Sequence, residues 1–141
     1  MVSLDVVQKR LRLLNGYLNK LYSIQSRITL EQFLADSDMQ DIVERNLHLA
    51  IETVLDIGQH IIASSGWQPA EEYRNVFPIL QQHDVITSDL LARVQGMAGF
   101  RNLLVHEYTA IDHGQVFHVL KNHLDDLVEL ARAYQNFVDA N

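Results

Sequence analysis

One stretch of the sequence, residues 100–108, concentrates side chains that can act on a charged substrate. It contains Arg101, His106 and Tyr108, so it reads Arg-x4-His-x-Tyr. Arginine is a permanent cation with a fork of N–H donors, an imidazole can take up or release a proton near neutral pH, and a phenol offers a hydroxyl. Residues 90–105 contain no Asp or Glu, although the chain has 18 acidic residues. The residues alone therefore predict an anion site, suited to a phosphodiester.

The spacing of these residues limits how they can meet. On an ideal helix Arg101 and His106 lie about 140° apart. They can converge only if the long arginine side chain wraps round, if the helix distorts, or if a second copy of the chain supplies the opposing residue. Asn102 precedes His106 by four residues and shares its face, so we expect the Asn102 amide to hydrogen-bond the imidazole and support it.

Two glycines precede the motif on the same predicted helix. Gly96 and Gly99 each cost a helix interior about 1 kcal/mol relative to alanine, which indicates close approach of another backbone or of a ligand. A symmetric homodimer that packs this face against its own copy would bring two sets of Arg101 and His106 to one cleft.

Composition excludes several other classes of protein. The formal net charge of −7 argues against non-specific coating of nucleic acid, which depends on many Lys and Arg residues. There is no cysteine for disulfides or thiolate metal sites, no apolar run long enough to span a membrane and no signal peptide, so we expect a cytoplasmic protein. His113, His118 and His123 recur every five residues and cannot share a helix face, so we expect no metal site and no cofactor.

The helical periodicity of the chain predicts the scaffold. With 141 residues, two prolines, six glycines and little β-branched alternation, we expect one all-α domain over residues 1–141. It should be an antiparallel bundle of four main helices plus one or two short ones. The predicted helices span about 4–26, 29–35, 38–64, 70–82, 88–107 and 113–139. Their predicted boundaries are N-caps at Ser3, Thr29, Ser37, Thr87 and Asp112, a C-cap at Gly66, and a break or kink at Pro78.

The chain resembles the HEPN superfamily, and within it the HepT-like toxins of bacterial toxin–antitoxin pairs. The resemblance rests on Arg101, His106 and Tyr108 in register, with polar Asn102 after the arginine, near the end of a penultimate helix. It implies a single HEPN-like domain with metal-independent endoribonuclease activity on tRNA or mRNA. Arg101 would hold the scissile phosphate, and His106 would assist attack of the ribose 2′-hydroxyl, leaving a cyclic phosphate.

The same resemblance implies regulation and partners. A cognate nucleotidyltransferase antitoxin would transfer AMP to Tyr108 and so neutralise the toxin. The expected partners are therefore RNA, this antitoxin and a second copy of the chain, with no membrane and no DNA. Two alternatives remain: a non-catalytic HEPN-type partner of a nucleotidyltransferase, and a plain interaction bundle in which the motif serves packing alone.

Overall fold

The structure of the chain is a computed structural model that describes residues 3–141, apart from the side chain of Tyr108. Every regular element in that range is helical, which confirms the predicted all-α class. The α-helices are α1 (Leu4–Gln25), α2 (Leu30–Leu34), α3 (Ser37–Ser64), α4 (Val76–Gln82), α5 (Ser88–Val94), α6 (Met97–His106), α7 (His113–Asn122) and α8 (Leu124–Ala140). Two short 3-10 helices are η1 (Tyr73–Asn75) and η2 (Tyr108–Ala110).

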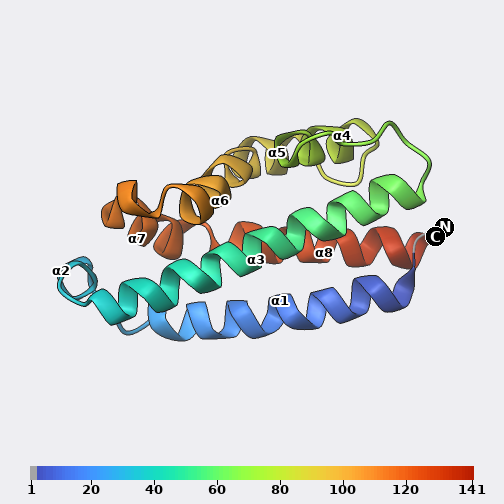
Figure 1. Cartoon of the computed structure of the whole chain (residues 1–141). Coiled ribbons are helices and arrows are strands. Elements are labelled where there is room, and N and C mark those ends of the chain that lie inside the picture. Colours follow the sequence, from blue (N-terminus) through green and yellow to red (C-terminus); the bar gives the residue numbers. More distant parts are fainter. Residues whose placement is uncertain (1–2) are drawn as a thin grey trace.

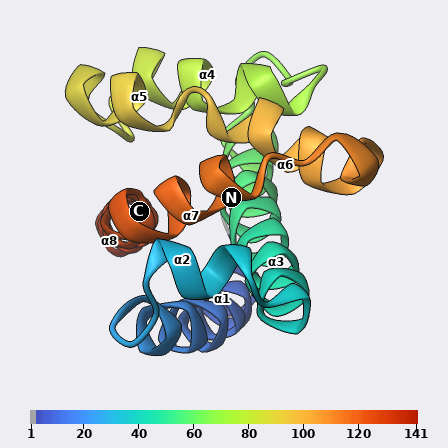
Figure 2. The ribbon, with the colours of Figure 1, turned by 90° about the vertical axis from the view of Figure 1, so that its left-hand side faces the viewer.

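The long helix α3 lies at the centre of the arrangement. It runs antiparallel to α1 and also packs against α4, α6, α7 and α8 (Figure 1). Viewed along the bundle, α4, α5 and α6 form a layer on the side of α3 that faces away from α1 (Figure 2). The helix that carries the Arg-x4-His motif therefore rests on the most connected helix of the bundle.

Apolar stripes at helical spacing build the core. The predicted stripe of α1 is buried at Val7, Leu11, Leu14, Leu18 and Leu21. The buried stripe of α3 comprises Val43, Leu47, Ala50, Ile51, Val54, Leu55, Ile57, Gly58, Ile61 and Ile62. Burial of such residues is the main favourable contribution to folding, at about 25 cal/mol per Å² of apolar surface. The two stripes face each other, so the sequence pattern of three and four dictates how α1 and α3 pair.

Gly58 is the tightest point of this core. A Cβ atom added there would lie 2.6 Å from Cγ1 of Val76, 3.0 Å from Cδ1 of Leu80 and 3.1 Å from the hydroxyl of Tyr134. That hydroxyl donates a 2.8 Å hydrogen bond to the carbonyl of Val54, so it cannot move aside freely. The absence of a side chain at residue 58 thus allows α3 to approach α4 and α8 closely.

We expect Gly58→Ala to lower the free energy of unfolding by about 1–3 kcal/mol through overpacking, despite alanine's higher helix propensity. Gly16→Ala is the matched control, because Gly16 lies on α1 with no atom within 4 Å of its Cβ position. The control should gain up to about 1 kcal/mol. Urea denaturation of both variants measures the difference, and equal stability would contradict the proposed close approach.

The predicted N-caps are mostly confirmed. Side-chain oxygens of Ser3, Thr29, Thr87 and Asp112 accept hydrogen bonds from backbone N–H groups of the following turn. Asp36, and not the predicted Ser37, caps α3, where its Oδ1 accepts from the N–H of Met39 at 3.0 Å. An ionised carboxylate one residue earlier also interacts favourably with the helix dipole, which a serine hydroxyl cannot match.

The end of α3 and the start of α4 follow from local chemistry. Gly66 has a φ of 74°, the left-handed conformation that glycine adopts without strain, and its N–H bonds the carbonyl of Ala63. The helix predicted over 70–82 begins later, with η1 at residue 73 and α4 at residue 76. Pro78 is the third residue of α4, where its missing N–H has no helical partner to lose.

Two helices predicted as continuous are each interrupted. The segment 88–107 divides into α5 and α6 at Gln95 and Gly96, and the segment 113–139 divides into α7 and α8 at His123. Glycine is a poor helix former, which accounts for the first break. The second break carries no glycine or proline, so its cause lies in tertiary contacts.

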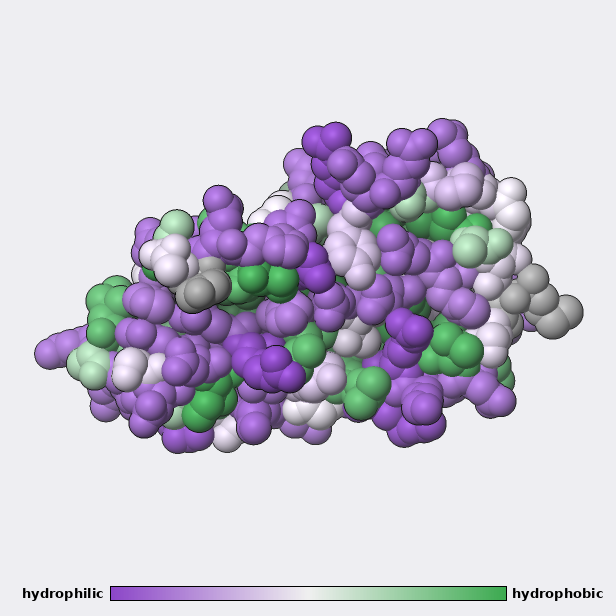
Figure 3. All heavy atoms as spheres, in the orientation of Figure 1, coloured by the Kyte–Doolittle hydropathy of each residue, from purple (hydrophilic) through white to green (hydrophobic). Residues whose placement is uncertain are grey.

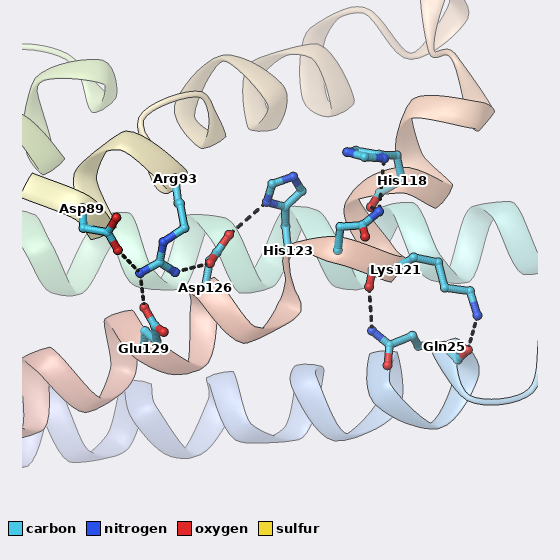
Figure 4. A network of polar contacts seen from close by, with 9 residues as sticks. Gln25, Asp89, Arg93, His118, Lys121, His123, Asp126 and Glu129 are labelled. Atoms are coloured by element: carbon cyan, nitrogen blue, oxygen red, sulfur yellow. Dashed lines mark hydrogen bonds and ion pairs between the residues drawn. The ribbon is translucent and has the colours of Figure 1, made fainter.

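A network of polar side chains holds the second break in place (Figure 4). Asp126 is 6% exposed, and its Oδ1 accepts a 2.6 Å hydrogen bond from Nη1 of Arg93. Its Oδ2 lies 2.9 Å from Nδ1 of His123. Arg93 also contacts Asp89 and Glu129, so α5 is tied to the first turns of α8. A buried carboxylate needs such partners, and Asp126 has them in the first turn of α8, directly after the break.

Gln25 completes this arrangement at the end of α7. Its side-chain amide donates to the backbone carbonyls of Leu120 at 2.9 Å and Lys121 at 3.4 Å, and its backbone carbonyl accepts from Nζ of Lys121 at 2.5 Å. Figure 4 shows the two contacts between Gln25 and Lys121. Carbonyls in the last turn of a helix lack helical donors, and the Gln25 amide provides one.

The molecular surface is largely hydrophilic on the face drawn in Figure 3, with apolar areas that are small and separate. Among the described residues, the large apolar side chains that are exposed are Leu4, Leu13, Leu30, Leu34 and Ile42. No helix in residues 3–141 is long and apolar enough to cross a membrane.

Candidate active site

The packing of α6 on α3 decides where each motif residue points. Met97, Phe100 and Leu104 form the buried side of α6. Arg101 follows Phe100 on the edge that borders α3, and its side chain is 15% exposed. His106 is the last residue of α6 and is exposed on the opposite edge. The core thus turns the two motif residues to different sides of one helix.

Arg101 is enclosed by residues of three elements. Its Nη2 contacts Oε1 of Glu52 on α3 at 2.5 Å, and its Nη1 donates to Oδ1 of Asn102 at 2.9 Å. Its Cζ lies 5.0 Å from the centroid of the Tyr73 ring of η1, a cation–π distance. Its Nε is buried with no acceptor among the described residues.

Further charges support Glu52. Partial burial of its carboxylate favours the neutral form, but the hydrogen bond and charge of Arg101, helped by His48, outweigh that effect and lower the pKa of Glu52. Nε2 of His48 lies 3.5 Å from Oε2 of Glu52, one helical turn away on α3. Glu52 is therefore ionised near neutral pH and is shared between a guanidinium and an imidazole.

Tyr73 is fixed from its other end. Its hydroxyl donates to Oδ1 of Asp56 at 2.7 Å, and Asp56 also lies 3.5 Å from Nη1 of Arg10 on α1. Burial and the hydrogen bond to Asp56 raise the pKa of Tyr73 to about 12, so the hydroxyl remains a donor. The ring beneath Arg101 is thus anchored to α3.

His106 has no hydrogen bond or ion pair within the described residues. The expected contact with Asn102 is not formed, because the Asn102 side-chain oxygen accepts from Arg101 instead. Asn102 therefore supports the cation of the motif and not its imidazole. The imidazole of His106 is free to contact a substrate.

The predicted modification site, Tyr108, lies beyond the end of α6. The helix predicted to reach residue 107 ends at His106, and Tyr108 begins η2. The side chain of Tyr108 lies outside the described structure, so its role remains a prediction.

Two of the three ways in which Arg101 and His106 could meet concern a single chain: wrapping of the arginine side chain and distortion of the helix. The Arg101 side chain extends towards α3 and does not wrap round α6. Residues Met97–His106 form one α-helix, and Gly96 lies just before it as the N-cap. In the described conformation, one chain does not bring the two groups together.

The two glycines that precede the motif leave open space on α6. Nothing in the described chain lies within 4 Å of a Cβ added at Gly96 or Gly99. Close packing against another part of the described chain therefore does not explain why glycine occupies these two positions. Asn102 and His106 are exposed beside Gly99 on the same side of α6.

Sequence reasoning missed Glu52, His48 and Tyr73. His48, Glu52 and Asp56 recur every four residues and so form a polar row beside the buried stripe of α3. The spacing of this row is visible in the sequence, but the sequence of α3 does not show which helix packs over it. Groups of three or more His, Asp or Glu residues able to hold a metal ion are absent from the part of the chain described.

Comparison with protein families gives one match over most of the chain. The model of the family described as "Ribonuclease HepT-like" matches residues 14–134. A protein of Aphanizomenon flos-aquae named tRNA nuclease HepT is 34% identical over 114 residues, which cover 79% of this chain and 76% of that protein. A protein of Shewanella oneidensis named mRNA nuclease HepT is 32% identical over 108 residues, or 77% and 76% of the two chains.

Solved structures show the same fold. The tri-AMPylated HEPN toxin of Shewanella oneidensis, in complex with an MNT antitoxin, superposes with a TM-score of 0.86 at 25% identity, covering 95% of this chain and 99% of that one. A toxin–antitoxin structure with AMP-PNP has a TM-score of 0.82 at 25% identity, covering 94% and 99%.

Proposed function

Because the chain belongs to the family of HepT-like ribonucleases, we propose that it is an RNA-cleaving toxin whose activity resides in Arg101 and His106. The observation that carries the proposal is the family match over residues 14–134, which include α6. That helix holds the enclosed guanidinium of Arg101 on one edge and the exposed imidazole of His106 on the other. Similarity to proteins named tRNA nuclease and mRNA nuclease supports RNA as the substrate class.

The reaction requires little from the protein besides these two groups. His106 takes the proton of a ribose 2′-hydroxyl, the 2′ oxygen attacks phosphorus, and the bond from phosphorus to the 5′ oxygen breaks. Arg101 binds the non-bridging oxygens, whose charge grows as the fifth bond forms. The products are a 2′,3′-cyclic phosphate and a 5′-hydroxyl. DNA has no 2′-hydroxyl and is not a substrate for this chemistry.

The site is completed by a second copy of the chain. This part of the proposal is supported by the divergence of Arg101 and His106 on α6 and by the bare surface at Gly96 and Gly99. An isologous dimer that includes that surface would bring the Arg101 and His106 residues of both copies to one cleft. Two imidazoles in one cleft also allow one to act as base while the other protonates the leaving oxygen.

A cognate nucleotidyltransferase antitoxin neutralises the toxin by attaching AMP to Tyr108. Support comes from the likeness to a tri-AMPylated HEPN toxin in complex with an MNT antitoxin. Tyr108 follows His106 by two residues, so an attached AMP adds bulk and negative charge next to the catalytic imidazole. RNA phosphates would then be repelled from the site and compete with AMP for Arg101.

Incubation of the purified protein with total RNA in EDTA tests the ribonuclease proposal. Cleavage without a divalent metal is the expected result. An alternative is a non-catalytic partner of the nucleotidyltransferase, which is favoured by the engagement of Arg101 with Glu52 in the free chain. Intact RNA together with tight binding to the nucleotidyltransferase would support that alternative and contradict the nuclease.

Treatment with the cognate nucleotidyltransferase and ATP should raise the intact mass of the protein by one or more AMP groups. Tyr108→Phe should gain no AMP, because it lacks the acceptor hydroxyl. Tyr17→Phe, on α1, serves as the control and should be labelled like the natural protein. Equal labelling of Tyr108→Phe would contradict the assignment of the acceptor.

A further inference from the structure

Glu52 contacts the motif arginine from a helix that the motif does not include. Its Oε1 lies 2.5 Å from Nη2 of Arg101, and the two residues are 49 positions apart in the chain. The Glu52 side chain is 29% exposed and that of Arg101 is 15% exposed, so the pair is screened less than a surface ion pair. This contact links α3 to the centre of the proposed site.

The contact fixes the direction of the guanidinium. Glu52 holds one terminal nitrogen, Asn102 holds the other, and the Tyr73 ring covers one face of the plane. An arginine side chain is otherwise flexible, and a group that must meet a phosphate in one geometry gains rate when it is held in advance. The Nε of Arg101 is buried and has no acceptor among the described residues, so the two terminal nitrogens make the contacts that fix its direction.

We propose that Glu52 is a positioning residue for RNA cleavage, which orients Arg101 towards the scissile phosphate while Tyr73 supports the guanidinium from below. The inference rests on the proposed ribonuclease function. Glu52 touches neither the RNA nor the reacting atoms, so it acts through Arg101 alone. His48, at 3.5 Å, keeps the carboxylate on the side of α3 that faces α6.

Per folded molecule, this role has a kinetic signature that neither a structural role nor a direct RNA contact has. A carboxylate beside the site repels RNA phosphates, so its removal leaves Arg101 with more uncompensated charge and favours substrate binding. The same removal lets the guanidinium move, which slows the chemical step. KM should therefore fall or stay unchanged while kcat falls. Loss of a direct RNA contact would instead raise KM. Partial unfolding would lower the apparent kcat at unchanged KM, and dividing the rates by the folded fraction removes that effect.

The test compares Glu52→Ala, Glu52→Gln and natural protein in RNA cleavage, with rates divided by the folded fraction from circular dichroism. Glu52→Ala should lower kcat by about 100-fold with no rise in KM. Glu52→Gln keeps an acceptor for Arg101 and the same shape, so it should recover part of kcat. Glu44→Gln is the matched control, since Glu44 also joins α3 to another helix, through His113 at 2.9 Å, and it should leave kcat unchanged.

The outcomes separate this inference from the function on which it rests. Natural protein that leaves RNA intact would overturn the proposed ribonuclease activity. Natural protein that cleaves RNA, with both Glu52 variants within about twofold of its kcat, would overturn the positioning role alone. A raised KM at unchanged kcat would also overturn it, because Glu52 would then act in substrate binding.

Discussion

Replacing Arg101 by alanine is expected to lower kcat/KM for RNA cleavage by about 10²–10³-fold, the cost of removing one preorganised donor group from a developing oxyanion. Arg101→Lys should recover little of that loss. Lysine keeps the charge but not the planar fork, so it cannot hold Glu52 and Asn102 on separate nitrogens while it binds a phosphate. The measurement is a cleavage time course on a defined RNA at several substrate concentrations.

Stability must be measured beside activity for this residue. Arg101 neutralises a partly buried carboxylate and stacks on Tyr73, so its removal also costs folding free energy. Arg132→Ala, an exposed arginine on α8, is the control for general loss of charge. If Arg101→Ala retained full activity per folded molecule, the motif would serve packing and the catalytic account would be wrong.

His106→Ala should reduce kcat by about 10²–10⁴-fold, the range found for removal of a general acid or base. Its folding stability should equal that of the natural protein, because the exposed imidazole makes no hydrogen bond or ion pair within the described residues. His118→Ala removes an equally exposed imidazole from α7 and should leave cleavage unchanged. A similar loss in both variants would show that the effect is not specific to His106.

The same two variants test whether the site is shared between copies. Mixing inactive Arg101→Ala with inactive His106→Ala allows subunits to exchange. In a mixed dimer one cleft then holds an intact arginine from one copy opposite an intact histidine from the other. Part of the activity should return on mixing, and a mixture as inactive as its components would contradict a site built across the interface.

Local signals in the sequence explain which parts of the fold could be predicted. Caps such as Thr29 and Thr87 act on their own helices, so short patterns locate them. The break at His123 within the helix predicted over 113–139 could not be predicted from such short patterns. The contact beside it joins Asp126 to Arg93, which lies 33 residues earlier in the chain, and no short pattern reveals such a pairing.

In the candidate site, too, local features could be predicted from the sequence and long-range contacts could not. The spacing of Arg101 and His106 on one helix was visible in the sequence, and the structure places them on different edges of α6, as that spacing predicts. The partners of Arg101 were not visible, because Glu52 and Tyr73 meet it only through the packing of α6 and η1 on α3. The Asn102 oxygen accepts from Arg101 and not from His106, since an adjacent guanidinium is a strong charged donor.

The chemistry of the ends left on cleaved RNA tests the central claim most directly. A guanidinium and an imidazole acting on a ribose phosphate, with no metal, must produce 2′,3′-cyclic phosphate and 5′-hydroxyl ends in the presence of EDTA. Mass spectrometry of the fragments from a synthetic RNA identifies both ends in one experiment. Fragments with 3′-hydroxyl and 5′-phosphate ends, formed only when Mg²⁺ is added, would contradict the account.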